Sequence, residues 1–346
     1  MRPPVPLADV RRVLVRCPNW LGDTVMAVPT LKALRGAAPA AEIWCRGPWV
    51  AALLEEEPAV DRRLPWESGW RASLRAAAEL RAAQVDLAVI LPNSFATALG
   101  VRAAGIRWRV GYAGDGRAGL LTHAVPPVRA HLHQVDAYLR LLRPLGIQPA
   151  GRVPTLRVAP HRREEARRLL ARVGLAPGEL AVAIQLGAAF GPSKLWPPNR
   201  LAALAARFAE RGVPSVFLGG PGAMPLLHAV EGALGKPARH LVGQDRPAVL
   251  PALLAEFGAL VAPDSGPAHV GAAVGIPVVA LFGPTDPRLT APLGERQVTL
   301  WERPPCAPCF QPHCPIDHRC MQALAVDDVV RAVLERLPHP SRPPRP

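Results

Sequence analysis

The stretch that decides the fold is 259–285, with the sequence ALVAPDSGPAHVGAAVGIPVVALFGPT. Its first apolar run, Ala259–Ala262, predicts a buried strand, and a second run, Pro277–Phe282, predicts another. Between them lie a Ser-Gly turn and Pro267–Val274, a stretch of small residues that we predict to be helical. Two buried strands joined through a helix form a βαβ unit, in which the strands run parallel. The stretch therefore predicts an α/β protein with a parallel sheet.

The same alternation of apolar runs and helical spacing extends outward over most of the chain. Further strands are predicted at Val10–Arg16, Ile43–Cys45, Asp86–Leu91, Trp108–Tyr112, Leu180–Leu186 and Ser215–Leu218. Helices are predicted at Asp23–Arg35, Ala72–Ala83, Ser94–Ala104, Leu132–Leu145, Arg162–Val173, Pro198–Arg211 and Ala248–Phe257. The pattern predicts two Rossmann-like lobes whose parallel sheets face a central cleft, with ligands beyond the carboxyl ends of the strands.

Proline-rich segments indicate where the lobes end. We expect a first lobe at 1–155 and a second at 179–337. The segment between them, 156–178, has prolines on both sides of a charged helix and is predicted to be the inter-domain connection. The tail 338–346, PHPSRPPRP, is predicted to be disordered because so proline-rich a segment has no apolar residues for a core.

The chain carries 41 Lys and Arg side chains against 27 Asp and Glu, a formal net charge of +14 over 346 residues. Only three of the basic residues are lysines, so a coding bias toward arginine is the simplest explanation. The alternative is an anionic partner such as a nucleotide, a nucleic acid or a phospholipid surface. Residues 1–173 hold 26 basic and 14 acidic side chains, whereas 174–346 hold 15 and 13. An electrostatic partner should therefore meet the first half.

The hydropathy of the sequence predicts the cellular compartment of the protein. The N-terminal segment Met1–Trp20 is interrupted by prolines and charges and has no apolar core typical of a signal peptide. The longest apolar stretch, Val270–Gly283, is shorter than the roughly 20 residues that a membrane-spanning helix needs. We expect a cytoplasmic protein with reduced cysteines, and peripheral contact with a membrane surface is left open.

The loop Trp20-Leu-Gly22-Asp23 joins a predicted strand to a predicted helix. Gly22 allows the backbone to approach a ligand closely. Asp23 lies at the start of the helix, where aspartate is a common N-cap. Two interpretations stay open: Asp23 caps the helix, or its carboxylate is held at the cleft as a general base.

A second loop, 187–197, has the sequence GAAFGPSKLWP and also follows a predicted strand. It lacks the G-x-x-x-x-G-K-[ST] order of a P-loop. Lys194 is either a solvated surface lysine or a point charge for a phosphate group.

The third candidate lies within the deciding stretch, where Asp264 and Ser265 precede the helix that contains Gly266 and His269. Backbone N–H groups at a helix N-terminus, together with the helix dipole, bind anions. Asp264 could bind sugar hydroxyls, and His269 follows one turn later on the same side. Each residue alone has a structural explanation as a cap or a core histidine, but the four converge on one place.

A Cys-rich segment, 306–320, contains Cys306, Cys309, Cys314 and Cys320 with two histidines between them. This composition is compatible with a tetrahedral structural zinc site, although the spacing is too compact for a zinc ribbon. The alternatives are a packed reduced cluster or a redox-labile pair. Cys17 and Cys45 are predicted to be small core residues.

Taken together, these motifs resemble glycosyltransferase family 9, the ADP-heptose:lipopolysaccharide heptosyltransferases, over roughly residues 11–337. The segments that carry the resemblance are Pro18–Asp23 (PNWLGD), Lys194–Pro197 (KLWP), Phe217–Gly220 (FLGG) and Asp264–His269 (DSGPAH). Within the family, the Cys-rich segment is most similar to the heptosyltransferase II members.

The resemblance implies a GT-B fold with an N-terminal acceptor lobe and a C-terminal donor lobe. It implies inverting, metal-independent transfer of heptose from ADP-L-glycero-β-D-manno-heptose to the first heptose of the lipopolysaccharide inner core. By the same resemblance, Asp23 is the general base, and Trp20 and Gly22 belong to the acceptor loop. Lys194 would contact the donor phosphates, and the segment from Asp264 through Ser265 and Gly266 to His269 would hold the heptose and diphosphate.

One departure concerns the nucleotide. Relatives commonly have an acidic residue soon after the strand at Phe217–Gly220 to bind the ribose, but here the next acidic residue is Glu231. A glycosyltransferase of the same fold with another acceptor or nucleotide sugar is therefore the first alternative. A zinc-containing nucleic-acid-binding protein is a remote one, because the arginines are dispersed and only 5% of residues are aromatic. We expect no nucleic-acid partner.

Overall fold

A computed structural model describes residues 3–128 and 131–337 of the chain. The chain divides into two units, Met1–Arg157 and Val158–Pro346, which are described separately below. Most of the segment predicted as a connection, 156–178, belongs to the C-terminal unit. It contains helix α7 (Pro160–Arg172), which packs against α10 (Leu250–Ala255). The tail predicted to be disordered lies outside the described residues.

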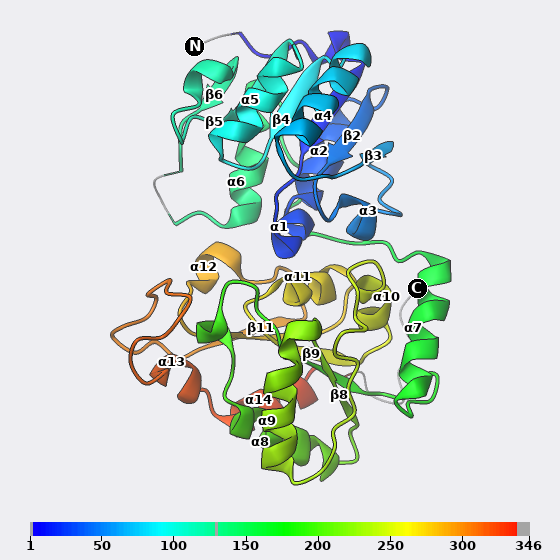
Figure 1. Cartoon of the computed structure of the whole chain (residues 1–346), viewed down its shortest axis with the longest axis vertical. Helices are drawn as coiled ribbons and strands as arrows, with labels where there is room; N and C mark the ends of the chain where they lie inside the picture. The colour runs from blue at the N-terminus through cyan, green and yellow to red at the C-terminus, as the bar shows by residue number, and fades with distance from the viewer. Residues whose placement is uncertain (1–2, 129–130, 338–346) are drawn as a thin grey trace. The chain divides into compact units, whose positions relative to one another are not determined.

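The described residues of the N-terminal unit form a six-stranded parallel sheet in the order β3-β2-β1-β4-β5-β6 (Figure 1). Its strands are β1 (Arg12–Arg16), β2 (Glu42–Arg46), β3 (Arg62–Leu64), β4 (Leu87–Ile90), β5 (Trp108–Tyr112) and β6 (His123–Val125). Its helices are α1 (Leu21–Met26), α2 (Val28–Ala37), α3 (Val50–Leu53), α4 (Trp70–Ala82), α5 (Phe95–Ala103) and α6 (Gln134–Arg140).

Both faces of this sheet are covered, which explains its continuous apolar strands. Side chains alternate between the faces, and Leu14 and Ile90 pack into one cluster with Leu80 of α4 and Val101 of α5. Val13 lies on the opposite face of the sheet and is also fully buried. Elsewhere in this unit α2 packs against α6.

The helix predicted at Asp23–Arg35 is two helices, α1 and α2, which meet at Ala27. Pro29 explains the break, because it has no N–H to donate to the carbonyl four residues earlier. The first helix also begins two residues before Asp23, at Leu21. Asp23 therefore lies inside the first turn of a short helix.

The described residues of the C-terminal unit form a five-stranded parallel sheet in the order β11-β10-β9-β7-β8 (Figure 1). Its strands are β7 (Val182–Gln185), β8 (Ser215–Leu218), β9 (Ala259–Pro263), β10 (Val278–Phe282) and β11 (Gln297–Trp301). Besides α7 and α10, its helices are α8 (Pro198–Ala209), α9 (Met224–Leu234), α11 (Gly266–Ala273), α12 (Pro287–Thr290), α13 (Arg319–Gln322) and α14 (Val326–Leu334).

One core cluster of this unit contains side chains of three helices and of the sheet. Phe208 of α8, Leu227 of α9 and Val333 of α14 are fully buried in one cluster with Ile184 of β7. The deciding stretch forms the predicted βαβ unit, in which β9 and β10 are paired in parallel. None of the helices within the described ranges is long and apolar enough to cross a lipid bilayer.

Candidate functional site

The loop that follows β1 presents the first predicted site residues. Trp20 is the N-cap residue of α1, with an extended backbone and an indole that is 58% exposed. Gly22 is buried, and Asp23 is half-buried in the first turn of the helix. Because the N-cap is Trp20, the capping interpretation of Asp23 is wrong, although a carboxylate in the first turn still interacts favourably with the helix dipole.

The buried side chain of Arg16 forms hydrogen bonds with this loop. The Arg16 guanidinium donates to the Asn19 side-chain oxygen at 2.8 Å and also to the Cys17 carbonyl. It stacks on the Trp66 ring, 4.2 Å from the ring centre. Burial lowers the pKa of Arg16 to about 10. The Trp49 indole donates to the Asn19 carbonyl at 2.8 Å, so the loop is fixed from two sides. Sequence reasoning did not single out Arg16.

Asp23 faces helix α6. Burial raises the pKa of the Tyr138 phenol, and the negative charge of Asp23 raises it further. Helix α1, which carries the half-buried Asp23, packs against α6, which carries the buried Tyr138. Such surroundings suit a carboxylate that accepts a proton during a reaction.

In the C-terminal unit the other predicted residues meet at the carboxyl ends of three adjacent strands, β7, β9 and β10. The loop after β7 carries Lys194, the residue after β9 is Asp264, and the loop after β10 carries Thr285. The Lys194 ammonium donates to Asp264 Oδ2 at 2.5 Å, and the Thr285 hydroxyl donates to the same oxygen at 2.7 Å. Lys194 is 9% exposed and Asp264 7%. The interpretation of Lys194 as a solvated surface lysine is therefore wrong.

Helix α11 begins directly beside this pair. Ser265 is its N-cap residue and Gly266 its first residue. Within the described residues, the buried Ser265 hydroxyl has no hydrogen-bond partner. His269 is buried one turn into the helix. The lysine charge and the positive end of the helix dipole thus lie together, as a diphosphate requires.

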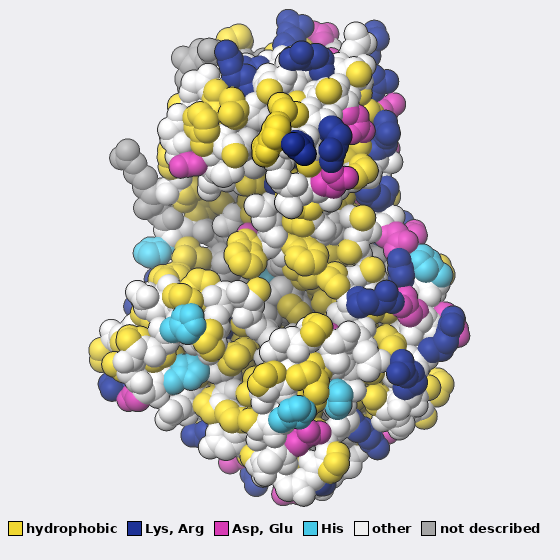
Figure 2. Space-filling model, in the orientation of Figure 1, with side chains coloured by type: hydrophobic (Ala, Val, Ile, Leu, Met, Phe, Trp, Pro, Cys, Tyr) yellow, Lys and Arg dark blue, Asp and Glu magenta, His cyan; other side chains and the backbone are white. Residues whose placement is uncertain are grey.

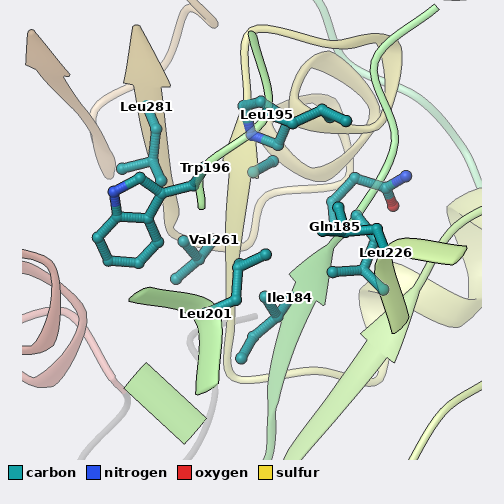
Figure 3. A pocket seen from close by; sticks show the side chains of 11 residues that line it. Ile184, Gln185, Leu195, Trp196, Leu201, Leu226, Val261 and Leu281 are labelled. Atoms are coloured by element: carbon teal, nitrogen blue, oxygen red, sulfur yellow. The ribbon is translucent and has the colours of Figure 1, made fainter. Parts of the chain in front are cut away.

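Apolar side chains line a hollow next to the loop that carries Lys194. Leu195 and Trp196, which follow the lysine, line a hollow together with Val261 of β9 and Leu281 of β10 (Figure 3). On the other side of the lysine, its ammonium lies 4.8 Å from the centre of the Phe190 ring. An aromatic face near a cation adds attraction and shields the ammonium from water.

The structure brings together Lys194, Asp264 and the start of α11, and it adds two residues that sequence reasoning missed. Thr285 and Phe190 lie within the motifs already quoted, but neither residue type signals a phosphate site by itself. Trp20, Gly22 and Asp23 lie in the N-terminal unit.

All six cysteines are free thiols. Cys17 and Cys45 are fully buried in the N-terminal core, as predicted. In the Cys-rich segment, Cys306 and Cys309 are exposed, Cys314 is half-buried and Cys320 is buried. Across residues 3–128 and 131–337, no three His, Cys, Asp or Glu side chains are grouped as a metal site.

Comparison with known proteins places this geometry in a family. The model of the glycosyltransferase family 9 (heptosyltransferase) domain matches residues 73–319. The chain belongs to glycosyltransferase family 9. A curated family member, lipopolysaccharide heptosyltransferase 2 of Salmonella typhimurium, is 31% identical over 303 residues, which cover 82% of this chain and 86% of the relative. Lipooligosaccharide heptosyltransferase 2 of Haemophilus influenzae is 30% identical over 83% of this chain and 88% of the relative.

Solved family 9 structures share the fold. E. coli ADP-heptose LPS heptosyltransferase II is 27% identical with a TM-score of 0.79, covering 94% of this chain and 98% of that one. The family 9 glycosyltransferase of Veillonella parvula has a TM-score of 0.84 at 23% identity, and the match covers 96% of this chain and 99% of that one. The predicted fold class, with two Rossmann-like parallel sheets, is confirmed, and this family 9 chain is a glycosyltransferase.

Proposed function

We propose that this glycosyltransferase transfers heptose from ADP-L-glycero-β-D-manno-heptose to the first heptose of the lipopolysaccharide inner core, with inversion and without a metal ion. The observation that carries the proposal is the buried Lys194–Asp264 pair at the N-terminus of α11. It offers a fixed cation and backbone amides to a diphosphate, and a carboxylate to a sugar hydroxyl. The names of the curated relatives support heptose and lipopolysaccharide as substrates.

In the proposed reaction an acceptor hydroxyl oxygen attacks the anomeric carbon of the donor heptose. The bond from that carbon to the β-phosphate oxygen breaks, and ADP leaves with the electron pair. The hydroxyl proton passes to the Asp23 carboxylate. Negative charge grows on the departing phosphate, where Lys194 and the start of α11 stabilise it without any rearrangement of the protein. Ser265, Gly266 and His269 hold the heptose and diphosphate in line.

Trp20 and Gly22 would border the acceptor. The acceptor is a phosphorylated lipid, so we also propose that the enzyme contacts the cytoplasmic face of the inner membrane. Lys and Arg side chains lie on the visible face of the N-terminal unit (Figure 2), whose residues 1–157 include 21 Lys and Arg against 12 Asp and Glu. Such a surface is attracted to anionic lipid, and sedimentation with anionic vesicles should weaken as salt is added. Vesicle binding that does not change with salt concentration would contradict the proposed membrane contact.

A glycosyl transfer from another nucleotide sugar is the second candidate, and one feature of the sequence favours it. The turn after β8, residues 219–225, contains no acidic side chain that could bind a ribose. Calorimetry with a panel of nucleoside diphosphates and nucleotide sugars separates the two candidates. ADP-heptose should bind most tightly and then support turnover on a lipid A–core acceptor. Tighter binding of a uridine or guanosine sugar would replace the donor assignment.

A further inference from the structure

The residue before Lys194 is held by the Cys-rich segment through every polar group it has. The Ser193 amide donates to the Pro312 carbonyl at 3.1 Å, and the Ser193 hydroxyl donates to the Gln311 carbonyl at 2.6 Å. The Ser193 carbonyl accepts from His318 Nε2 at 2.5 Å. A carbonyl cannot donate, so Nε2 of His318 carries the proton. Ser193 is only 3% exposed, which means that water cannot replace these bonds without local opening.

The backbones of the two segments approach each other too closely for most residues. A Cβ atom built on Gly191 would lie 2.4 Å from the Pro312 carbonyl oxygen. The φ of Gly191 is also +152°, a conformation that residues with a side chain rarely adopt. Glycine at this position therefore allows the contact that brings Ser193 against Pro312.

The same segment also holds the loop that carries Thr285. The amides of Cys309 and Phe310 both donate to the Pro284 carbonyl, at 3.0 and 2.8 Å. Pro284 immediately precedes Thr285, whose hydroxyl donates to Asp264. Residues 309–318 thus contact the direct neighbours of both side chains that donate to the Asp264 carboxylate.

We propose that residues 309–318 act as a clamp that positions Lys194 and Thr285 around Asp264, and that His318 and Ser193 are positioning residues for binding of the donor diphosphate. On the C-terminal side of Lys194 in the sequence, Leu195 and Trp196 line the apolar hollow described above. The clamp supplies the other side through directed hydrogen bonds, which set where the ammonium stands. The link to the diphosphate rests on the proposed function, whereas the mechanical role of the clamp does not.

The test compares three variants. His318→Ala removes the bond to the Ser193 carbonyl, and His318→Gln restores an amide donor at similar reach. Both variants carry the same left-handed backbone at 318, so their difference isolates the hydrogen bond. His313→Ala is the matched control, because His313 is an exposed histidine of the same segment.

Two readouts are measured on the full chain: hydrogen exchange of peptides that cover 187–196, and the dissociation constant of ADP by calorimetry. In His318→Ala we expect at least fivefold faster exchange at the Ser193 and Lys194 amides and five- to tenfold weaker ADP binding. His318→Gln should recover most of the protection from exchange and most of the ADP affinity. His313→Ala should match the wild type in both readouts. In turnover, the donor KM should rise while the acceptor KM stays unchanged.

Unchanged exchange in His318→Ala, or equal changes in His313→Ala, would overturn the clamp. If His318→Ala fails to fold, Ser193→Ala provides the same test, since it removes only the hydroxyl bond to Gln311. A wild-type protein that does not bind ADP would refute the proposed function instead, and the exchange comparison, which needs no ligand, would still decide the mechanical role.

Discussion

Replacement of Lys194 by methionine separates the contribution of the buried Lys194–Asp264 pair to protein stability from the contribution of Lys194 to donor binding. Methionine has a similar length and no charge, so the packing against Phe190 and the loop is largely kept. The Asp264 carboxylate, however, loses its ammonium partner and keeps the hydrogen bond from the Thr285 hydroxyl. Because both side chains are buried, loss of one partner leaves an uncompensated charge, which costs about 3–5 kcal/mol.

In thermal unfolding, a loss of this size lowers the transition midpoint of the C-terminal unit by about 10 °C, given roughly 2–4 °C per kcal/mol for a unit of its size. A second change, Asp264→Asn, removes the unpaired charge but keeps an oxygen that accepts the Thr285 hydroxyl. The double variant Lys194→Met, Asp264→Asn should therefore recover most of the lost stability.

Unlike the stability, the affinity for the donor should stay low in the double variant. Loss of a hydrogen bond from an ammonium to a phosphate costs about 1.5–3 kcal/mol, which is roughly a 10- to 150-fold weaker affinity. Calorimetry with ADP should show this loss in both variants. It should be larger in the single variant, because the bare Asp264 carboxylate repels the diphosphate.

Two results would refute this reasoning. ADP affinity that stays at the wild-type value in Lys194→Met would mean that Lys194 does not contact the phosphates. A double variant as unstable as the single one would mean that the stability loss has another cause than an unpaired charge.

Three further outcomes are expected. Asp23→Asn should abolish heptose transfer and leave ADP affinity within twofold of the wild type, because only the proton acceptor is lost; measurable turnover in a coupled ADP-release assay would remove Asp23 as the base. Burial raises the pKa of Asp245 to about 6, so the folded protein binds this proton more tightly than the unfolded chain does. Stability therefore falls as pH rises from about 4 to 6, and Asp245→Asn should be more stable than the wild type at pH 7 by up to about 3 kcal/mol, a difference that denaturant titration should find to vanish below pH 4. Elemental analysis of the purified, folded protein should find no stoichiometric zinc in the Cys-rich segment; one bound zinc per chain whose removal unfolds the protein would show that the four thiols are ligands.

The sequence was most informative for strands that are largely buried, wherever they lie in the sheet. The strands β5 and β8 lie at the predicted residues, Trp108–Tyr112 and Ser215–Leu218. The observed β4 is one residue shorter than predicted at each end, and β10 begins one residue later than predicted. Such strands are covered on both faces, so their apolar runs are continuous.

Of the edge strands in the described residues, β8 was predicted, but the other three had too weak a signal. No strand was predicted for β3, β6 or β11, which lie at sheet edges. Their residues are partly exposed, and β3 consists of Arg62, Arg63 and Leu64. Edge strands commonly carry charges, so they lack the pattern that identifies a central strand.

The candidate site was predictable in parts but not as a whole. The sequence indicated that Lys194 and Asp264 each follow a strand, but they are 70 residues apart in the chain. Their contact depends on the strand order β10-β9-β7, which makes β7 and β9 neighbours. Local patterns do not determine that order. The bond from His318 to Ser193 is harder still to predict, because 306–320 is mostly irregular.

The pairing of Lys194 with Asp264 before any donor arrives bears on catalysis itself. In the proposed reaction, an ammonium that already has a carboxylate partner would gain less when it exchanges that partner for the phosphate of the intact donor than for the more highly charged ADP, so the pair would moderate the affinity for the intact donor. As the sugar–phosphate bond breaks, negative charge on the leaving oxygen increases and the attraction to Lys194 grows. Interactions that strengthen toward the transition state raise the rate, whereas uniform binding does not. In the proposed reaction Asp264 would therefore have two roles: it holds the Lys194 ammonium in place, and it leaves most of the attraction to Lys194 for the moment when ADP departs.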